Sequence, residues 1–177
     1  MFLYIIHRTK TTIVRLIILL VAVGLFSCRQ QTNTSAADLD TKKIQTEVQA
    51  VIGQIFEAAA QVDTVKLYEV FSFGDPDFRY MEVTGVFYDV AAYKQMVRDF
   101  YGPLKSEILN KGTEKFTFLD NNNVLWSYSG GLTATFNDGK QEVYDPFGMT
   151  MLFRKSNDKW KVVFLQESTQ VPVVKAQ

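Results

Sequence analysis

The residues that could carry out chemistry are few in kind, because the chain has one histidine, His7, and one cysteine, Cys28. Both precede residues 40–177, where the apolar pattern predicts a folded domain. Catalysis by Ser-His-Asp or Cys-His groups, zinc binding through His or Cys, and disulfides are therefore excluded in that domain. Acid–base chemistry is left to Asp, Glu, Lys and Tyr. The candidates are Glu82, Tyr80 two residues before it on the same strand face, and Asp145.

Two acidic segments raise the question of a metal site. Neither Asp75-Pro76-Asp77 nor the run from Asp120 to Asn123 has the D-x-[DN]-x-[DN]-G spacing of a calcium loop. The turn-forming chemistry of Asp, Asn and Pro accounts for both segments. We therefore expect no metal and no cofactor.

Composition and charge limit the class of protein. Hydrophobic residues make up 47% of the 177 residues and aromatic residues 14%, which is enough for a packed core. Lys and Arg total 19, as do Asp and Glu, but Arg8, Lys10 and Arg15 precede Cys28 with no acid among them. The part after Cys28 thus has 16 basic and 19 acidic residues. Such a domain offers no dense cationic face, so nucleic acid is excluded as a partner.

The first 28 residues resemble the signal of a bacterial lipoprotein. Leu16 to Phe26 is an apolar run of eleven residues behind the basic segment, and a membrane-spanning helix needs about 20. The run ends in Leu25-Phe26-Ser27-Cys28, which resembles a lipobox. The resemblance implies acylation of Cys28 and anchoring to a membrane of the bacterial cell envelope, outside the cytoplasm. An uncleaved membrane anchor is the alternative, if Ile13 and Val14 extend the run.

The expected organisation therefore has three parts. Residues 1–27 form the signal peptide. Residues 28–39 contain the lipidated cysteine and a polar tether, which is short of bulky apolar side chains. Residues 40–177 form one domain, a size that a single hydrophobic core can support.

Three helices are expected in the first half of this domain. The first is capped by Asp40 or Thr41 and runs to about Val62, and Asp63 caps a short second helix. Residues 78–83 form a strand. Asp89 caps a third helix, which Gly102-Pro103 bends or interrupts before Leu104, Ile108 and Leu109.

Alternation of period two begins at Lys115 and predicts long strands. A bulge or sharp bend is expected at Gly130-Gly131, and turns at Asn137-Asp138-Gly139 and Ser156-Asn157-Asp158. The apolar side chains that share one face are Val124, Trp126, Tyr128, Leu132, Ala134, Phe136, Phe147, Met149, Met151 and Phe153. The predicted fold is α+β, with helices packed on the concave face of a curved antiparallel sheet.

This order of elements resembles the NTF2-like superfamily, and within it the SnoaL-like group. The clearest motif is the final strand, Trp160 to Ser168 (WKVVFLQES), which resembles the family's closing W-x-[IV]-x-x-x-H-x-S strand. Gln166 stands at the position where many relatives have histidine. The resemblance implies a cone-shaped fold with an apolar pocket between sheet and helices, in a family whose members include isomerases, dehydratases and cyclases as well as proteins without known activity.

The segment Tyr80 to Gly85 resembles the part of the isomerase-like members that places a base carboxylate three residues before a glycine, and Glu82 is at that position. In an apolar pocket the pKa of this carboxyl is expected to rise toward the range of a useful base. The isomerase-like members also have a protonated aspartate on a later strand. Met149 or Thr150 aligns with it here, and neither can replace it.

The favoured function is a non-catalytic module that binds a small apolar molecule or assists another protein, because the acid–base set is incomplete. Aromatic and methionine side chains on one concave face suit such a ligand, and Gln166 and Ser168 could orient it by hydrogen bonds. The residues expected to bind it are Trp126, Tyr128, Phe147, Met149, Met151, Phe164, Gln166 and Ser168.

Two alternatives stay open. One is an isomerase- or lyase-type enzyme in which Glu82 removes a proton next to a carbonyl, Tyr80 donates to the developing enolate, and Asp145 or Gln166 completes the site. The other is a homodimer formed through the outer sheet face, for which Val163, Leu165 and Leu152 are the candidates.

Overall fold

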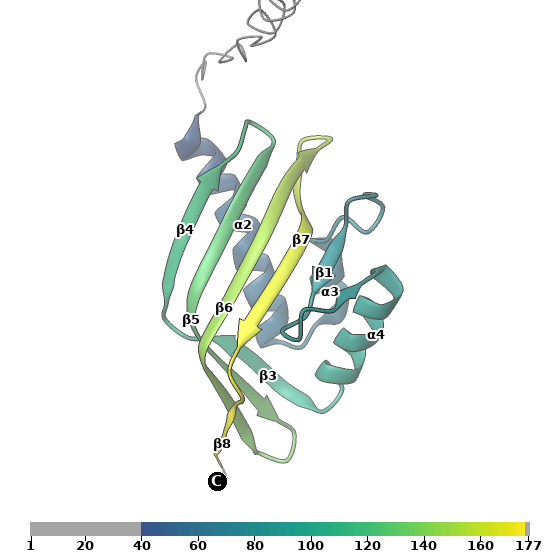
Figure 1. Cartoon of the computed structure of the whole chain (residues 1–177), viewed down its shortest axis with the longest axis vertical. Coiled ribbons are helices and arrows are strands. Elements are labelled where there is room, and N and C mark those ends of the chain that lie inside the picture. Colours follow the sequence, from purple (N-terminus) through teal and green to yellow (C-terminus); the bar gives the residue numbers. More distant parts are fainter. Residues whose placement is uncertain (1–39, 176–177) are drawn as a thin grey trace, which may run out of the picture. The chain divides into compact units, whose positions relative to one another are not determined.

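The computed structural model describes residues 40–175. The expected signal peptide, Cys28 and the tether lie outside these residues. Among the described helices, none is both long and apolar enough to cross a membrane. In chain order the elements are α2 (Thr41–Ala60), α3 (Thr64–Glu69), β1 (Arg79–Met81), β2 (Phe87–Tyr88), α4 (Val90–Tyr101), β3 (Leu104–Leu109), β4 (Thr113–Phe118), β5 (Asn123–Phe136), β6 (Gln141–Ser156), β7 (Lys159–Thr169) and β8 (Val173–Lys175) (Figure 1).

The three helices begin where the sequence predicts, because an aspartate caps each one. The carboxylate of Asp40 accepts a hydrogen bond from the backbone N–H of Lys43, and Asp89 accepts from that of Ala92 in the same way. Asp63 accepts from two backbone N–H groups at the start of α3. Each cap satisfies donors that the first turn of a helix leaves without partners.

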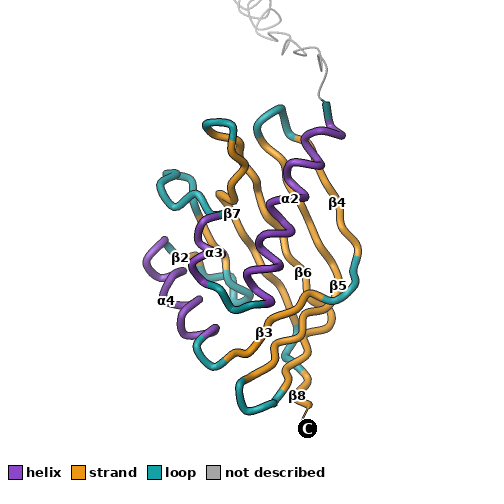
Figure 2. Tube along the Cα trace, turned by 180° about the vertical axis from the view of Figure 1, so that it is seen from behind, coloured by secondary structure: helices purple, strands orange, loops and turns teal. Residues whose placement is uncertain are grey.

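All described strands belong to one eight-stranded sheet with the order β2-β1-β7-β6-β5-β3, with β4 paired to β5 and β8 to β6. The long strands β5, β6 and β7 are antiparallel, as expected. β1, however, runs parallel to β7, with Tyr80 opposite Leu165. The sheet is therefore mixed and not purely antiparallel. Figure 2 shows α2, α3 and α4 together on one face of it.

The expected irregularity at Gly130-Gly131 is present. The register between β5 and β6 shifts between Gly130 and Leu132. Here the hydroxyl of Tyr128 accepts from the N–H of Gly131 and donates to the carbonyl oxygen of Asn110, with the Gly131 carbonyl oxygen also within 3.0 Å. A Cβ at Gly130 would overlap the Tyr128 hydroxyl, so the close approach requires glycine.

Residues 104–109 differ from the prediction. The third helix ends at Tyr101, and the chain continues as strand β3. Pro103 has no backbone N–H and its ring disfavours continuation of the helix, and β3 then pairs with β5 from Leu104 to Leu109. Glu107 therefore lies on a strand of the sheet, and the predicted helix would have put its side chain elsewhere.

The second difference is a bulge in β7. Phe153 of β6 pairs with Val162, and Leu152 pairs with Phe164, so Val163 is an extra residue. An extra residue reverses which side chains face the core. Leu165 therefore faces inward, contrary to the expectation that it belongs to the outer face.

Candidate functional site

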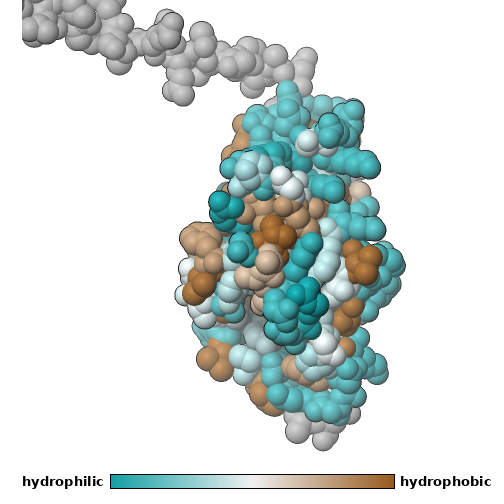
Figure 3. Space-filling model, turned by 90° about the vertical axis from the view of Figure 1, so that its right-hand side faces the viewer, coloured by the Kyte–Doolittle hydropathy of each residue, from teal (hydrophilic) through white to brown (hydrophobic). Residues whose placement is uncertain are grey.

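A cavity of about 270 Å³ lies between the helices and the sheet, and its walls come from α2, α3, α4, β1, β3, β5, β6 and β7. Most of its lining is apolar. The side chains that bring polar atoms to it are Tyr80, Glu82, Tyr93, Tyr101, Glu107, Tyr144, Glu167 and Thr169. On the side of the molecule shown in Figure 3, apolar surface gathers in the middle and polar residues surround it.

Five of the predicted site residues line the cavity: Tyr80, Glu82, Phe147, Met149 and Met151. Tyr80 and the three residues from β6 are buried, and Glu82 is partly exposed in the turn that follows β1. The structure thus brings together residues from two distant parts of the sequence, as the alternation in β6 and the position of Glu82 led us to expect.

Trp126 and Tyr128 are buried in the core and do not line the cavity. The Trp126 ring packs against Phe56 of α2 at 5.9 Å between centroids, and its Nε1 donates to Glu114 over 2.9 Å. The hydroxyl of Tyr128 is hydrogen-bonded to Asn110 and Gly131 at the β5 bulge. The polar atoms of both side chains thus have partners within the protein, and both residues belong to the hydrophobic core.

Phe164, Gln166 and Ser168 do not line the cavity either, because the bulge at Val163 turns them to the opposite face of β7. Asp145 is exposed and lies outside the cavity. These four residues were expected in the pocket, and that placement is wrong.

The bulge brings Glu167 into the cavity instead. The hydroxyl of Tyr80 donates to Oε2 of Glu167 over 2.8 Å. Burial raises the pKa of Glu167 above its ordinary value, and the nearby carboxylate of Glu82 adds to this, while the hydrogen bond from Tyr80 opposes it. Protein surrounds Glu167 on most sides, yet its side chain keeps some surface toward the cavity. Glu167 is thus a carboxyl group that holds its proton more tightly than an exposed glutamate does.

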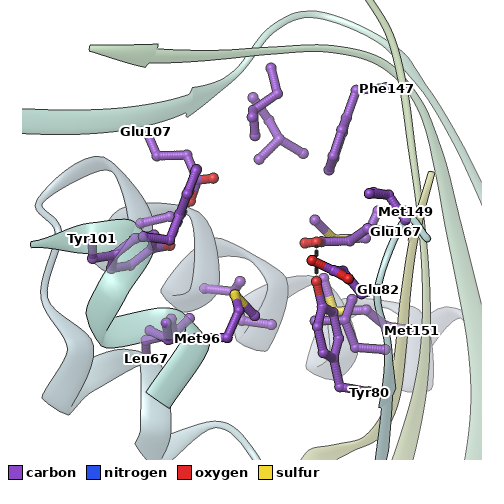
Figure 4. A pocket seen from close by; sticks show the side chains of 18 of the residues that line it. Leu67, Tyr80, Glu82, Met96, Tyr101, Glu107, Phe147, Met149, Met151 and Glu167 are labelled. Atoms are coloured by element: carbon purple, nitrogen blue, oxygen red, sulfur yellow. Dashed lines mark hydrogen bonds between the residues drawn. The ribbon is translucent and has the colours of Figure 1, made fainter. Parts of the chain in front are cut away.

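A second pair lies on the opposite side of the cavity, where Tyr101 of α4 donates to Oε2 of Glu107 on β3 over 2.5 Å. Figure 4 shows this pair facing Tyr80, Glu82 and Glu167 across the open space. Burial raises the pKa of Glu107 to about 7, although the hydrogen bond from Tyr101 works against the rise. At neutral pH this carboxyl is therefore divided between its protonated and ionised forms.

Glu82 is held in the turn between β1 and β2. Its Oε2 accepts from the hydroxyl of Thr84 over 2.7 Å and from that of Tyr88 over 3.3 Å. The backbone N–H of Gly85 also donates to the Glu82 carbonyl oxygen, in a turn where the φ of Gly85 is 82°. The three-residue spacing between Glu82 and Gly85 therefore positions the carboxylate at the edge of the cavity.

The sequence interpretation missed Glu107, Glu167 and Tyr101. Glu107 was missed because Leu104, Ile108 and Leu109 are spaced as on one face of a helix. Directly after α4, this spacing predicts more helix and not a strand. Glu167 is the only acidic residue of β7, a strand with several buried apolar side chains, and such a single acid is a usable signal. Alternation counted from Trp160 assigned it to the wrong face.

Other charged groups of the described residues lie outside the cavity. Arg154 pairs with Asp75 and Asp77 at 2.9 and 3.0 Å, and Glu47 accepts from Lys155 and Trp160 at 2.8 Å each. The Arg154 pairs connect the turn at Asp75–Asp77 to β6, and the Glu47 contacts connect α2 to β6 and β7. Within residues 40–175, no three acidic side chains lie close enough together to hold a metal ion.

No protein-family model matches the sequence, and no curated protein matches it. Solved structures do match. A hexachlorocyclohexane dehydrochlorinase from Novosphingobium barchaimii is 12% identical with a TM-score of 0.63, and covers 79% of this chain and 95% of its own. A putative scytalone dehydratase from Novosphingobium aromaticivorans is 9% identical with a TM-score of 0.66, covering 79% and 93%.

An NTF2-like superfamily protein from Salmonella enterica serovar Typhimurium is 16% identical, with a TM-score of 0.60, and covers 74% of this chain and 94% of its own. The chain therefore has the NTF2-like α+β cone fold, with a curved mixed sheet. Proteins with this fold include enzymes and proteins of unknown function.

Proposed function

We propose that the domain binds a small, largely apolar molecule in the cavity between its helices and its sheet. The observation that carries the proposal is the cavity itself, about 270 Å³ in volume and lined mainly by apolar side chains. This volume is close to the lower end of the range of roughly 300–1,000 Å³ found for ligand pockets. Met96, Met149 and Met151 give the wall flexible side chains that adapt to ligand shape.

Filling the cavity tests this function. Ala59 is buried on α2 and lines the cavity, so Ala59→Phe should occupy the space and abolish binding of small aromatic probes. Ala50 is exposed on the same helix, and Ala50→Phe is the matched control that should bind as the unmodified protein does. Binding can be followed by ligand-observed NMR with 2-phenylethanol. Equal binding by both variants would place the ligand elsewhere and contradict the proposal.

The proposed setting is the bacterial cell envelope, with the domain anchored by an acylated Cys28. The supports are the basic segment, the apolar run and the Leu25-Phe26-Ser27-Cys28 sequence. Labelling of expressing cells with radioactive palmitate should mark the protein, and Cys28→Ala should remove the label. Retention of label in Cys28→Ala would show that the anchor is not at this residue.

A second candidate function is acid–base catalysis of the isomerase or lyase type, which the arrangement of carboxyl groups favours. Glu82 and Glu167 lie on one side of the cavity and Glu107 on the other (Figure 4). A carboxylate on one side could remove a proton while protonated Glu107, with a pKa of about 7, donates on the other. The names of two structural neighbours, a dehydrochlorinase and a dehydratase, describe eliminations of this kind.

Proton abstraction can be tested without knowing the substrate. The protein should accelerate the exchange of deuterium from D₂O into the positions next to the carbonyl of cyclohexanone, followed by NMR. Glu82→Gln, Glu167→Gln and Glu107→Gln should each slow the exchange, by up to about 10²–10⁴-fold for the general base. Glu57 is exposed on α2, so Glu57→Gln is the control. Exchange at the rate of the buffer alone would exclude this second function.

A further inference from the structure

The charged groups of the cavity all have one sign. Among the residues that the structure describes, three carboxyl groups line it, those of Glu82, Glu107 and Glu167, and no Lys or Arg does. An anionic ligand would meet only like charges in a space of low polarity, where such repulsion is strong. The cavity is therefore built for a neutral or cationic molecule.

In its ionised form, each of these carboxyl groups also has an acceptor oxygen without a protein partner. The protein donors to Glu167 and Glu107 reach only Oε2, and both donors to Glu82 reach its Oε2 as well. Among the described residues, the Oε1 atoms have no protein donor, and none of them is sealed off in the core. A ligand that enters the cavity therefore meets unused acceptors, and it satisfies them only if it carries N–H or O–H donors.

The aromatic rings add to this preference. Tyr80 and Tyr93 line the same part of the cavity with ring centroids 5.0 Å apart, and Tyr80 carries the hydroxyl that donates to Glu167. Tyr80 also stacks on Tyr88, with ring centroids 5.7 Å apart. This aromatic wall suits a ligand whose body is apolar.

We propose that the ligand of this cavity is an amine with an apolar body, and that its ammonium group lies between Glu82 and Glu167. This inference rests on the proposed binding function and names its ligand class. Glu82 raises the pKa of Glu167 through the repulsion between their charges. An ammonium placed at this wall opposes that repulsion and favours the ionised form of Glu167, and both side chains then accept charge-assisted hydrogen bonds from it.

Three probes with the same apolar body and different charge test the class: 2-phenylethylamine, 2-phenylethanol and 3-phenylpropionate. Their dissociation constants for the full chain are measured by calorimetry at pH 7.5. The amine should bind at least about tenfold more tightly than the alcohol, because charge-assisted hydrogen bonds are roughly twice as strong as neutral ones. The carboxylate should not bind.

Equal or tighter binding of the alcohol or the carboxylate overturns the amine proposal but leaves the binding function in place. Absence of binding by all three probes overturns both. Glu82→Gln and Glu167→Gln should each weaken binding of the amine more than binding of the alcohol, because only the amine loses a charge partner, and Glu57→Gln should change neither. A variant that loses its near-ultraviolet circular dichroism has lost its tertiary structure. The proposal is then tested by the pH dependence of amine binding in the unmodified protein.

That pH dependence has a defined sign. The groups that face Glu167 from the packed elements are Tyr80, Glu82, Tyr93, Tyr101 and Glu107. All of them are acids, so ionisation of the carboxyls can only strengthen the attraction for an ammonium. Affinity for 2-phenylethylamine should rise from pH 5.5 to pH 8, while that for 2-phenylethanol stays level. Weaker amine binding at pH 8 than at pH 5.5 would overturn the proposal.

Discussion

The hydroxyl of Tyr80 donates to Oε2 of Glu167 over 2.8 Å, from β1 to its parallel neighbour β7. The contact depends on two features of the sheet. The parallel pairing places Tyr80 opposite Leu165, two residues before the glutamate. The extra residue in β7, Val163, turns Glu167 toward the cavity. This hydrogen bond thereby joins β1, which precedes Glu82, to the carboxyl group of Glu167 on β7.

Removing this hydroxyl should change the titration of Glu167. In Tyr80→Phe the pKa of Glu167 is expected to rise further, because the hydrogen bond from Tyr80 favours the ionised form. The free energy of unfolding should fall by about 1 kcal/mol, the usual net value of a hydrogen bond. Carboxyl ¹³C NMR follows the titration. Tyr68→Phe is the control, since its hydroxyl donates to the Lys94 carbonyl oxygen outside the cavity. A Glu167 midpoint that does not move in Tyr80→Phe would contradict the role of the contact.

Glu107 should make stability depend on pH between about 4.5 and about 7. Its pKa is about 7 in the folded protein against an ordinary value of 4.5, so the folded state binds more protons than the unfolded state between these values. Stability therefore falls as the pH rises through this window, by up to about 3 kcal/mol. Glu107→Gln should remove that part of the fall, measured by urea unfolding at several pH values. Curves of the same slope for both proteins would contradict the burial of this carboxyl.

The bulge in β7 makes opposite predictions for two neighbours. Leu165 is buried and lines the cavity, so Leu165→Ala should cost about 2 kcal/mol or more in the free energy of unfolding. Phe164 is partly exposed on the other face, and Phe164→Ala should cost less. Without the bulge Phe164 would face the core, and Phe164→Ala would cost more free energy of unfolding than Leu165→Ala. Chemical unfolding of the two variants distinguishes these cases.

Two glycines should respond in opposite ways to alanine. A Cβ at Gly130 would overlap the Tyr128 hydroxyl, so Gly130→Ala should destabilise the protein by about 1–3 kcal/mol. Gly53 lies inside α2, and a Cβ added there would have no neighbouring atom within 4 Å, so Gly53→Ala should stabilise by about 0.5–1 kcal/mol. Thermal unfolding measures both. Similar effects at the two sites would contradict the close approach at the β5 bulge.

The features that local chemistry determines were predicted correctly from the sequence. Asp40, Asp63 and Asp89 each stand directly before a helix, where a short carboxylate satisfies free N–H groups. The glycine pair at Gly130-Gly131 marked the bulge in β5, since only glycine fits there. The apolar alternation of β6 placed Met149 and Met151 on the inner face for the same local reason.

The features set by distant partners were not predicted. Nothing next to Val163 marks the β7 bulge, because the register depends on how β6 and β7 pair over their length. β3 forms because β5 offers an edge for Leu104 to Leu109, which outweighs the helical spacing of those residues. Glu107 and Glu167 reach the cavity through these two long-range effects, so the candidate site was predicted only in part.

Methionine methyl NMR tests the central claim most directly. Met96, Met149 and Met151 line the cavity, whereas Met81, on β1, does not. When 2-phenylethylamine or 2-phenylethanol is added to protein labelled with ¹³C at its methionine methyl groups, we expect the first three signals to shift with the same saturation curve and the signal of Met81 to stay in place. Unchanged signals from all three cavity methionines at saturating probe, or a shift confined to Met81, would show that the cavity is not a binding site.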